Sequence, residues 1–438
     1  MPVNSGNNNV INTRTNEFSA YAIFVVLFLA NYFIHSSIYS IFLLVIAACL
    51  IIRYKPILMI VPCMLSDTLQ GYFMITDTLS FNRALAILFV IGCFVHYRRI
   101  RITKFSFIPI ILSLYLLASG LWSVTGSFND AISFSISMAM LILLESIEDY
   151  NRNSLFKLFN FSFILYGISL ALLTFIKAGG LNVSQVVFDD AFNANTICAS
   201  LALSACIVYG SYSIGNGFSK IITYGYIGVC IVSILLIGSR TSLIGLVVSV
   251  LVTYIFANKH KGTSISPKKV LAFVIVIASI VAVLYFVMRN NPSVYYRFTF
   301  SSENRLDVAS VTRRTEVWKA LIYYVIPAHL FFGVGFGLLN VKTVVAPYVL
   351  YAKHAHNMFF AILSETGLVG LLLFLSFFIH YFVKIIKSKN LDRVFIIAIL
   401  AFAFVNGIGE EMINQRWMWL SFGLCGLLLK SEEQREIL

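Results

Sequence analysis

The sequence predicts an all-α, polytopic membrane protein, because its composition is strongly apolar and its apolar runs are long enough to span a bilayer. Hydrophobic residues make up 59% of the 438 residues, charged residues only 12%, and the mean hydropathy is +0.87. A soluble globular chain carries about a quarter charged residues. Since a spanning helix needs about 20 apolar residues, the chain has room for a dozen or more spans and little else.

The apolar runs place these spans along the chain, and we expect about 12–14 transmembrane helices. The expected spans are 18–34, 38–52, 56–75, 82–97, 105–123, 131–147, 158–176, 197–214, 221–238, 241–257, 270–288, 358–383, 394–408 and 416–429. Three of these runs are short or weak, one of them because it contains Asp67, so twelve or thirteen spans also fit. Neither an internal repeat nor a Gly/Ser-rich linker divides the sequence, which predicts a single membrane-embedded domain over residues 1–438.

Short basic loops orient these spans. Segments 53–55, 98–104, 259–269 and 384–393 fall on one side, which the positive-inside rule assigns to the cytoplasm. Both termini then face the cytoplasm, and residues 289–357 form one large outward loop containing short helices. The net charge of +13 is explained by orientation and lipid contact, so no nucleic-acid partner is expected. The seven cysteines all lie in apolar runs and are expected to act as small packing residues.

The outward loop is basic. It carries eight Lys or Arg residues against three Asp or Glu residues, and three of the seven histidines also lie in it. Long loops cross the membrane despite positive charge, so translocation permits this excess without requiring it. An anionic ligand outside the membrane explains the excess, and anionic lipid headgroups are the alternative.

Two arginines are candidate phosphate ligands. Arg314 opens a predicted helix that ends before Pro327, and the backbone N–H groups at a helix N-terminus and the arginine fork both favour phosphate oxygens. The simpler alternative is a surface ion pair with Glu316. Arg240 lies in a tight outward turn between two spans, where it either binds an anion or extends to the membrane surface.

Two further arginines, Arg83 and Arg416, lie near outward helix ends and are candidate accessory residues. Because Glu410 and Glu411 lie close to Arg416 in the sequence, we interpret these arginines as partners in structural ion pairs more readily than as ligands.

Histidines next to a predicted span are candidates for proton transfer. His356, with His354 as the alternative, precedes Asn357, a predicted N-cap of the span from residue 358. A histidine held there at neutral pH suits deprotonation of a hydroxyl. Zinc is the other use of such a pair, but no third ligand stands at a familiar spacing, so no metal is expected. Segment 333–337, Gly-Val-Gly-Phe-Gly, is a turn that lets backbones approach closely and lacks the spacing of a dinucleotide fingerprint.

Several of these segments, in this order, resemble the O-antigen ligase and O-antigen polymerase superfamily. They are Asn193-Ala194-Asn195, the Ser239-Arg240-Thr241 turn, Arg314 with Trp318 ahead of the 333–337 turn, and His354-Ala355-His356-Asn357 leading to Glu365-Thr366-Gly367-Leu368-Val369-Gly370. The resemblance is strongest over about 190–380, and the earlier spans match only in being apolar. It implies a multi-pass glycosyltransferase of the bacterial inner membrane with its active site facing the periplasm.

The resemblance also implies the reaction. A glycan is transferred, with inversion, from undecaprenyl diphosphate to another lipid-linked repeat by a polymerase, or to the lipid A core by a ligase; we expect the polymerase. Arg240 and Arg314 would match the family's phosphate-binding arginines, with Arg313 as the alternative to Arg314, and His356 or His354 its catalytic histidine. No cofactor is expected. The expected partners are the lipid-linked oligosaccharide, the acceptor glycan and membrane lipids, with a chain-length regulator and a flippase also considered.

A flippase or other transporter is the hypothesis from a different class. Transport predicts ionisable residues within midplane helices and two related halves. Charge within the expected spans is scarce, Asp67, Glu145 and Glu365 being the main cases, and no repeat is evident. A structural scaffold in a polysaccharide assembly complex is a further alternative, and it predicts that the loop tolerates Arg314→Ala.

Overall fold

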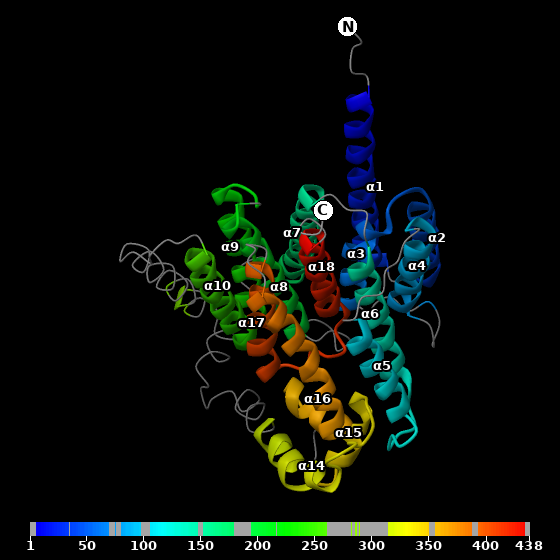
Figure 1. Cartoon of the computed structure of the whole chain (residues 1–438), viewed down its shortest axis with the longest axis vertical. Coiled ribbons are helices and arrows are strands. Elements are labelled where there is room, and N and C mark those ends of the chain that lie inside the picture. The colour runs from blue at the N-terminus through cyan, green and yellow to red at the C-terminus, as the bar shows by residue number, and fades with distance from the viewer. Residues whose placement is uncertain are drawn as a thin grey trace.

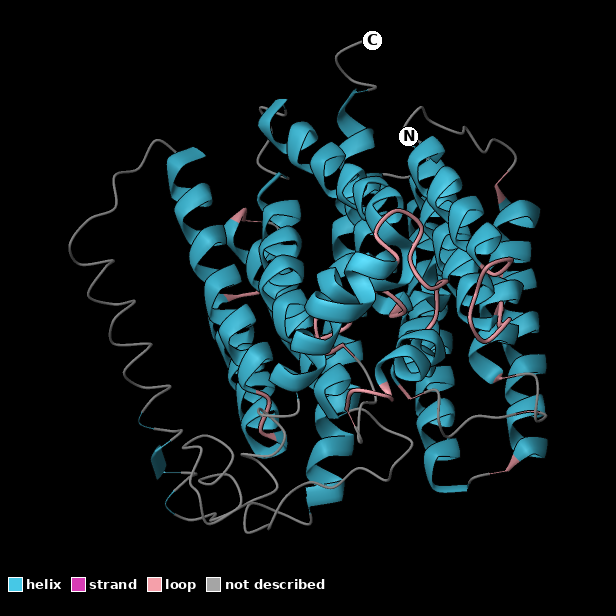
Figure 2. Cartoon of the chain, turned by 90° about the horizontal axis from the view of Figure 1, so that it is seen from below, coloured by secondary structure: helices cyan, strands magenta, loops and turns pink. Residues whose placement is uncertain are grey.

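The structure is a computed structural model of the chain. It describes residues 6–34, 36–69, 80–97, 106–147, 152–178, 194–215, 217–260, 314–349, 355–387 and 393–433, with a few isolated positions between them. Within these ranges the elements are helices, packed side by side (Figure 2). This confirms the predicted all-α fold class.

The helix bounds follow the apolar runs closely. The helices are α1 (Gly6–Ile34), α2 (Ser37–Arg53), α3 (Ile60–Thr68), α4 (Phe81–His96), α5 (Phe107–Ser119), α6 (Asn129–Ser146), α7 (Arg152–Ala178), α8 (Ala194–Ser213), α9 (Lys220–Ile237), α10 (Arg240–His260), α14 (Ile326–Ala328), α15 (Leu338–Val345), α16 (Met358–Lys387), α17 (Arg393–Gly409) and α18 (Arg416–Glu433). A 3-10 turn, η1 (Pro56–Met59), precedes α3.

Among the described residues, six helices are long and apolar enough to cross a membrane: α1, α7, α8, α9, α10 and α16. Shorter apolar helices lie beside them, and large apolar side chains such as Ile38 and Ile221 are more than four-fifths exposed on the outer surface in the absence of lipid. A bilayer would cover such side chains, since lipid tails are as apolar as they are. The chain is a multi-pass membrane protein.

Two expected spans need comment. The run 56–75 forms η1 and α3 and ends at Thr68. Its last turn is polar, and its side chains are hydrogen-bonded to other helices. Asp67 accepts a hydrogen bond from the Asn82 side chain at 3.0 Å, and the Thr68 hydroxyl lies 2.6 Å from the Tyr166 hydroxyl. This α3 is too short to cross a bilayer alone. The expected span 270–288 lies outside the described residues, apart from isolated positions.

The predicted helix at Arg314 is present but does not end before the proline. Residues 314–320 are α-helical, Leu321–Val325 form a π-helical turn, η4, and α14 continues through Pro327 to Ala328. The Ile326 N–H bonds to the Leu321 carbonyl, which shifts the hydrogen-bond register just before the proline. Because proline lacks a backbone N–H, its position after this shift leaves no donor unpaired.

The arrangement of helix ends gives the bundle two distinct faces. Figure 1 shows the start of α1 and the end of α18 toward one end of the molecule, and α14 and α15 at the other. Helix α10 packs against α17 and α8, whereas α16 packs against both α17 and α5. The start of α16 therefore lies between α17 on one side and the connection from α5 to α6 on the other.

Candidate active site

The turn between α9 and α10 places Arg240 at a helix N-terminus. Helix α9 ends at Gly238, whose φ of 86° is left-handed and whose N–H bonds to the Ile234 carbonyl. The chain then reverses within one residue, so Arg240 is the first residue of α10. This is the tight turn that the sequence predicted, and it puts a guanidinium beside backbone N–H groups that favour an anion.

The end of α17 gathers three of the functional segments. Gly409 packs against Thr241, since a Cβ on this glycine would lie 2.6 Å from the threonine side chain. The Arg314 guanidinium donates through Nη1 to the Gly409 carbonyl at 3.3 Å. The Asn357 side chain donates to the Ile408 carbonyl at 2.9 Å. The backbone carbonyls at the end of α17 thus accept hydrogen bonds from side chains of two segments that are far from α17 in the sequence.

His356 lies at this junction in a strained backbone conformation. Its φ of 50° makes it the one residue other than glycine with a positive φ among the described residues. The next residue, Asn357, caps α16 as predicted, with its Oδ1 accepting from the N–H groups of Phe359 and Phe360 at 2.9 and 3.0 Å. Strain of this kind persists only where surrounding contacts impose it, and it concentrates at functional sites.

Trp318 connects the Arg314 helix to the histidine segment. Its indole N–H donates to the Ala355 carbonyl at 2.6 Å, and its ring meets Phe360 edge-on with centroids 5.7 Å apart. One turn of helix separates Trp318 from Arg314, so the same contacts fix the positions of the arginine and of His356. Arg240, Arg314 and His356 are each partly buried, and Nη1 of Arg240 is fully buried.

Two acids that sequence reasoning assigned to Arg416 belong instead to this junction. Glu410 and Glu411 follow Gly409 directly, and both oxygens of the Glu411 carboxyl are buried although the residue as a whole is only partly so. Burial, the neighbouring Glu410 carboxylate and Asp130 raise the pKa of Glu411 to about 8, and the Ala355 backbone N–H partly offsets them. The raised pKa favours the neutral form of the Glu411 carboxyl near neutral pH.

The predicted pairing of Arg416 with these acids is wrong. Arg416 is fully buried and donates to the Asn82 carbonyl at 3.1 Å, to the Asn82 side chain and to the Ser137 hydroxyl at 3.3 Å. Asp67 accepts from the Arg416 backbone N–H. These partners bond Nε and Nη1 of the buried guanidinium, and they lie at a sequence distance that local proximity does not reveal.

Arg83 lies in the first turn of α4, next to Asn82, where its backbone N–H bonds to the capping Ser80. Among the described residues, no hydrogen bond joins Arg83 or Arg416 to the end of α17. The alternatives His354 and Arg313 lie outside the described residues.

The glycine-rich segment 333–337 approaches the backbone of α16. At Gly367, with φ 65°, α16 departs from helical geometry, and the N–H groups of Val334 and Gly335 bond to the carbonyls of Ser364 and Glu365 at 3.0 and 2.9 Å. A Cβ on Gly333 would lie 2.3 Å from the Glu365 backbone. The predicted close approach thus occurs between two protein segments, and it fixes the first half of α16.

A comparison with known protein families points to the part of the chain that contains these candidate residues. A family model described as O-antigen ligase matches residues 225–375, which include Arg240, Arg314 and His356. A search for similar curated proteins finds no match. The family match confirms the resemblance predicted from the sequence.

Proposed function

We propose that this chain, which matches the O-antigen ligase family model over residues 225–375, is a membrane glycosyltransferase of the O-antigen ligase and polymerase superfamily that uses a glycan linked to undecaprenyl diphosphate on the periplasmic face. The observation that supports the proposal is that Arg314 and the chain neighbours of Arg240 and His356, namely Thr241 and Asn357, all contact the end of α17. Two cations beside two helix N-termini suit a diphosphate, and an imidazole beside them suits proton transfer.

The diphosphate is the group that the arginines hold. Opposite unit charges 4 Å apart attract by about 4 kcal/mol at an effective dielectric constant of 20. Arg240 and Arg314 would offset the charge that develops on the leaving diphosphate as its bond to the sugar breaks. The protonated Glu411 adds no opposing charge near neutral pH, because burial keeps its pKa at about 8.

His356 acts on the acceptor. Its imidazole takes the proton from the acceptor hydroxyl while the hydroxyl oxygen bonds to the anomeric carbon. The bond from that carbon to the diphosphate oxygen breaks, and its electron pair leaves with undecaprenyl diphosphate. Direct displacement of this kind inverts the anomeric configuration. The proton then passes from the imidazole to solvent.

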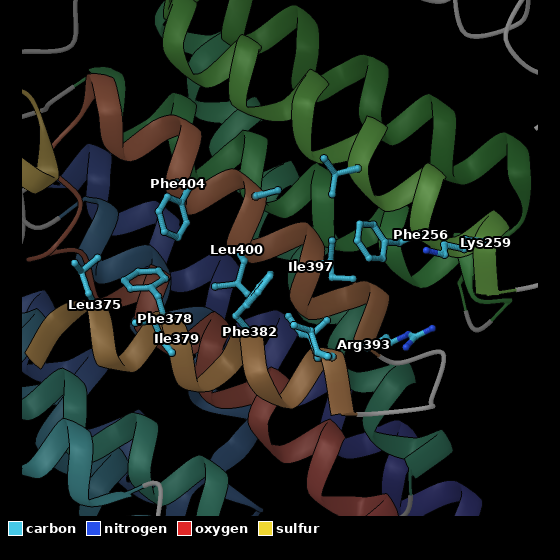
Figure 3. A pocket seen from close by; sticks show the side chains of 14 residues that line it. Phe256, Lys259, Leu375, Phe378, Ile379, Phe382, Arg393, Ile397, Leu400 and Phe404 are labelled. Atoms are coloured by element: carbon cyan, nitrogen blue, oxygen red, sulfur yellow. The ribbon is translucent and has the colours of Figure 1, made fainter. Parts of the chain in front are cut away.

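An apolar groove below the site suits part of the polyprenyl chain. It has a volume of about 670 Å³ and lies between α10, α16 and α17, with Leu375 and Phe404 toward one end and Lys259 and Arg393 at the other (Figure 3). Phe404 precedes Gly409 by five residues, or about 8 Å along a helix, and its ring contacts Phe359. A donor whose diphosphate lies at Arg240 would direct its tail toward this groove.

We propose the polymerase as the specific activity. The ligase is the second candidate, because the matching family is described as O-antigen ligase. Deletion of the gene distinguishes them through the surface glycan. A single repeat on the core indicates that a polymerase is missing, whereas a bare core with long lipid-linked glycan accumulating indicates a missing ligase. An unchanged glycan profile would contradict both.

A further inference from the structure

A second pocket, polar in character, lies on the other side of α16 from Arg240. Its volume is about 390 Å³, and its polar lining comes from the connection between α5 and α6 and from α15. The polar lining residues are Thr125, Ser127, Asn129, Asp130, Asn340 and Lys342. The volume falls within the usual range for sites that bind small molecules.

Hydrogen bonds hold the walls of this pocket rigid. The Asn340 side-chain oxygen accepts from the Thr125 N–H at 3.0 Å and from the hydroxyls of Ser123 and Thr125 at 2.9 and 2.7 Å. Its amide nitrogen donates to the Gly335 carbonyl at 2.9 Å. The Asp130 Oδ2 accepts from the Leu338 N–H at 3.0 Å, which ties α6 to the start of α15.

Other polar groups in the pocket are not used by the fold. The Asn129 side-chain amide and the Lys342 ammonium have no hydrogen bond or ion pair with the part of the chain that the structure describes. Asn129 and Lys342 thus offer an amide donor, an amide acceptor and an ammonium donor beside the Asp130 carboxylate. A pocket with donors, acceptors and one charge of each sign suits a neutral, hydroxyl-rich ring better than a lipid headgroup or an apolar group.

The pocket adjoins the candidate active site. The Gly337 N–H, in the pocket wall, donates to the Glu365 carboxylate at 2.9 Å. Asp130 lies near enough to Glu411 to act on its carboxyl electrostatically, and Glu411 lies beside the Ala355 N–H that precedes His356. Since α16 packs against α17 on one side and α5 on the other, its N-terminal segment separates this pocket from Arg240. A general base at His356, between this pocket and Arg240, would face the donor on the Arg240 side and the acceptor on the pocket side.

We propose that this pocket binds a sugar residue of the acceptor glycan through Asn129, Asp130 and Lys342. The proposal rests on the proposed function, because it takes the second substrate to be a glycan. Sugar hydroxyls would bond to the Asn129 amide, the Asp130 carboxylate and the Lys342 ammonium, while Asn340 keeps the walls in place.

Binding of free glycans to the purified full-length chain tests this proposal. The probes are the oligosaccharide released by mild acid from the lipid-linked repeat of a deletion strain and the core oligosaccharide released from its lipid A. The variant Asn129→Ala/Lys342→Ala removes the two side chains that the fold does not use. The matched control is Thr343→Ala, an exposed change next to Lys342 whose hydroxyl bonds only within α15 among the described contacts.

We expect one of the two oligosaccharides to bind the wild type and Thr343→Ala, and to bind the double variant at least tenfold more weakly. Undecaprenyl diphosphate should bind the double variant normally and should not displace the oligosaccharide, whereas Arg240→Ala should lose only the diphosphate ligand. Equal binding to wild type and double variant, no binding to the wild type, or displacement by undecaprenyl diphosphate would overturn the acceptor pocket. Failure of the proposed function appears separately, as an absence of glycan transfer by the wild type.

Discussion

The positive φ of His356 allows its chemical role to be separated from its structural role by substitution. The left-handed region costs most residues other than glycine about 1–2 kcal/mol relative to the right-handed one, and asparagine, aspartate and histidine adopt it more often than the others. With φ at 50°, His356 carries this cost in the native state, and the Asn357 cap on its C-terminal side keeps it there. Asparagine tolerates the left-handed region and glycine has no Cβ, so neither substitution adds strain.

We therefore expect backbone strain to contribute no loss of stability in His356→Asn and His356→Gly. Relief of strain contributes at most about 1 kcal/mol after the extra chain entropy of glycine is subtracted. Glycan transfer should nevertheless fall by about 10²–10⁴-fold in both, the usual contribution of a general base. Thermal midpoints at one fixed heating rate in detergent and transfer rates in reconstituted vesicles measure the two effects.

The control is Asn357→Ala, which removes the cap from α16 and should lower stability by about 1 kcal/mol. If His356→Asn transferred glycan at the wild-type rate, the histidine would not be the base. If activity and thermal midpoint fell together in His356→Asn, the residue would be structural, and the reasoning from its backbone conformation would be refuted.

Three further predictions follow from the site. Arg314→Lys should weaken undecaprenyl diphosphate binding at least tenfold without loss of membrane insertion, because lysine lacks the fork that reaches both the ligand and the Gly409 carbonyl; wild-type affinity would contradict this. Transfer should decline as pH rises through about 8, where Glu411 ionises and repels the diphosphate, and Glu411→Gln should remove that decline from the pH profile. Gly333→Ala should lower the thermal midpoint more than Gly215→Ala does, since both glycines have positive φ but only the Cβ at 333 meets backbone, 2.3 Å away; equal losses would show that the contact with α16 is unimportant.

Much of the fold follows from local sequence. Long apolar runs specify helices because every backbone group in a bilayer must be bonded within its own segment, and α8, α9 and α10 begin within a few residues of the expected positions. The run around Asp67 was predicted to be weak, but the end of α3 at Thr68 was not predicted. The last residue of α3, Thr68, bonds to a tyrosine hydroxyl 98 residues away in the sequence, a contact that no local pattern indicates.

Sequence patterns predict the candidate side chains of the site, but they do not predict the backbone groups that hold these side chains. Charge, helix ends and histidine placement predict Arg240, Arg314 and His356 as site residues, and their segments meet at the end of α17. The carbonyls of Ile408 and Gly409, which bond to the Asn357 and Arg314 side chains, carry no signal of their own. The two consecutive acids after Gly409 are the one local signal for this segment, since the chain is poor in charge.

The central claim, that Arg240, Arg314 and His356 together transfer a glycan from a polyprenyl diphosphate, is tested most directly by the release of undecaprenyl diphosphate. The purified chain in vesicles would be given the lipid-linked glycan that a deletion strain accumulates. We predict release by the wild type in step with formation of a longer or newly attached glycan, and loss of both products in Arg240→Ala. Wild-type vesicles that release no undecaprenyl diphosphate, or Arg240→Ala vesicles that release it at the wild-type rate, would contradict the claim.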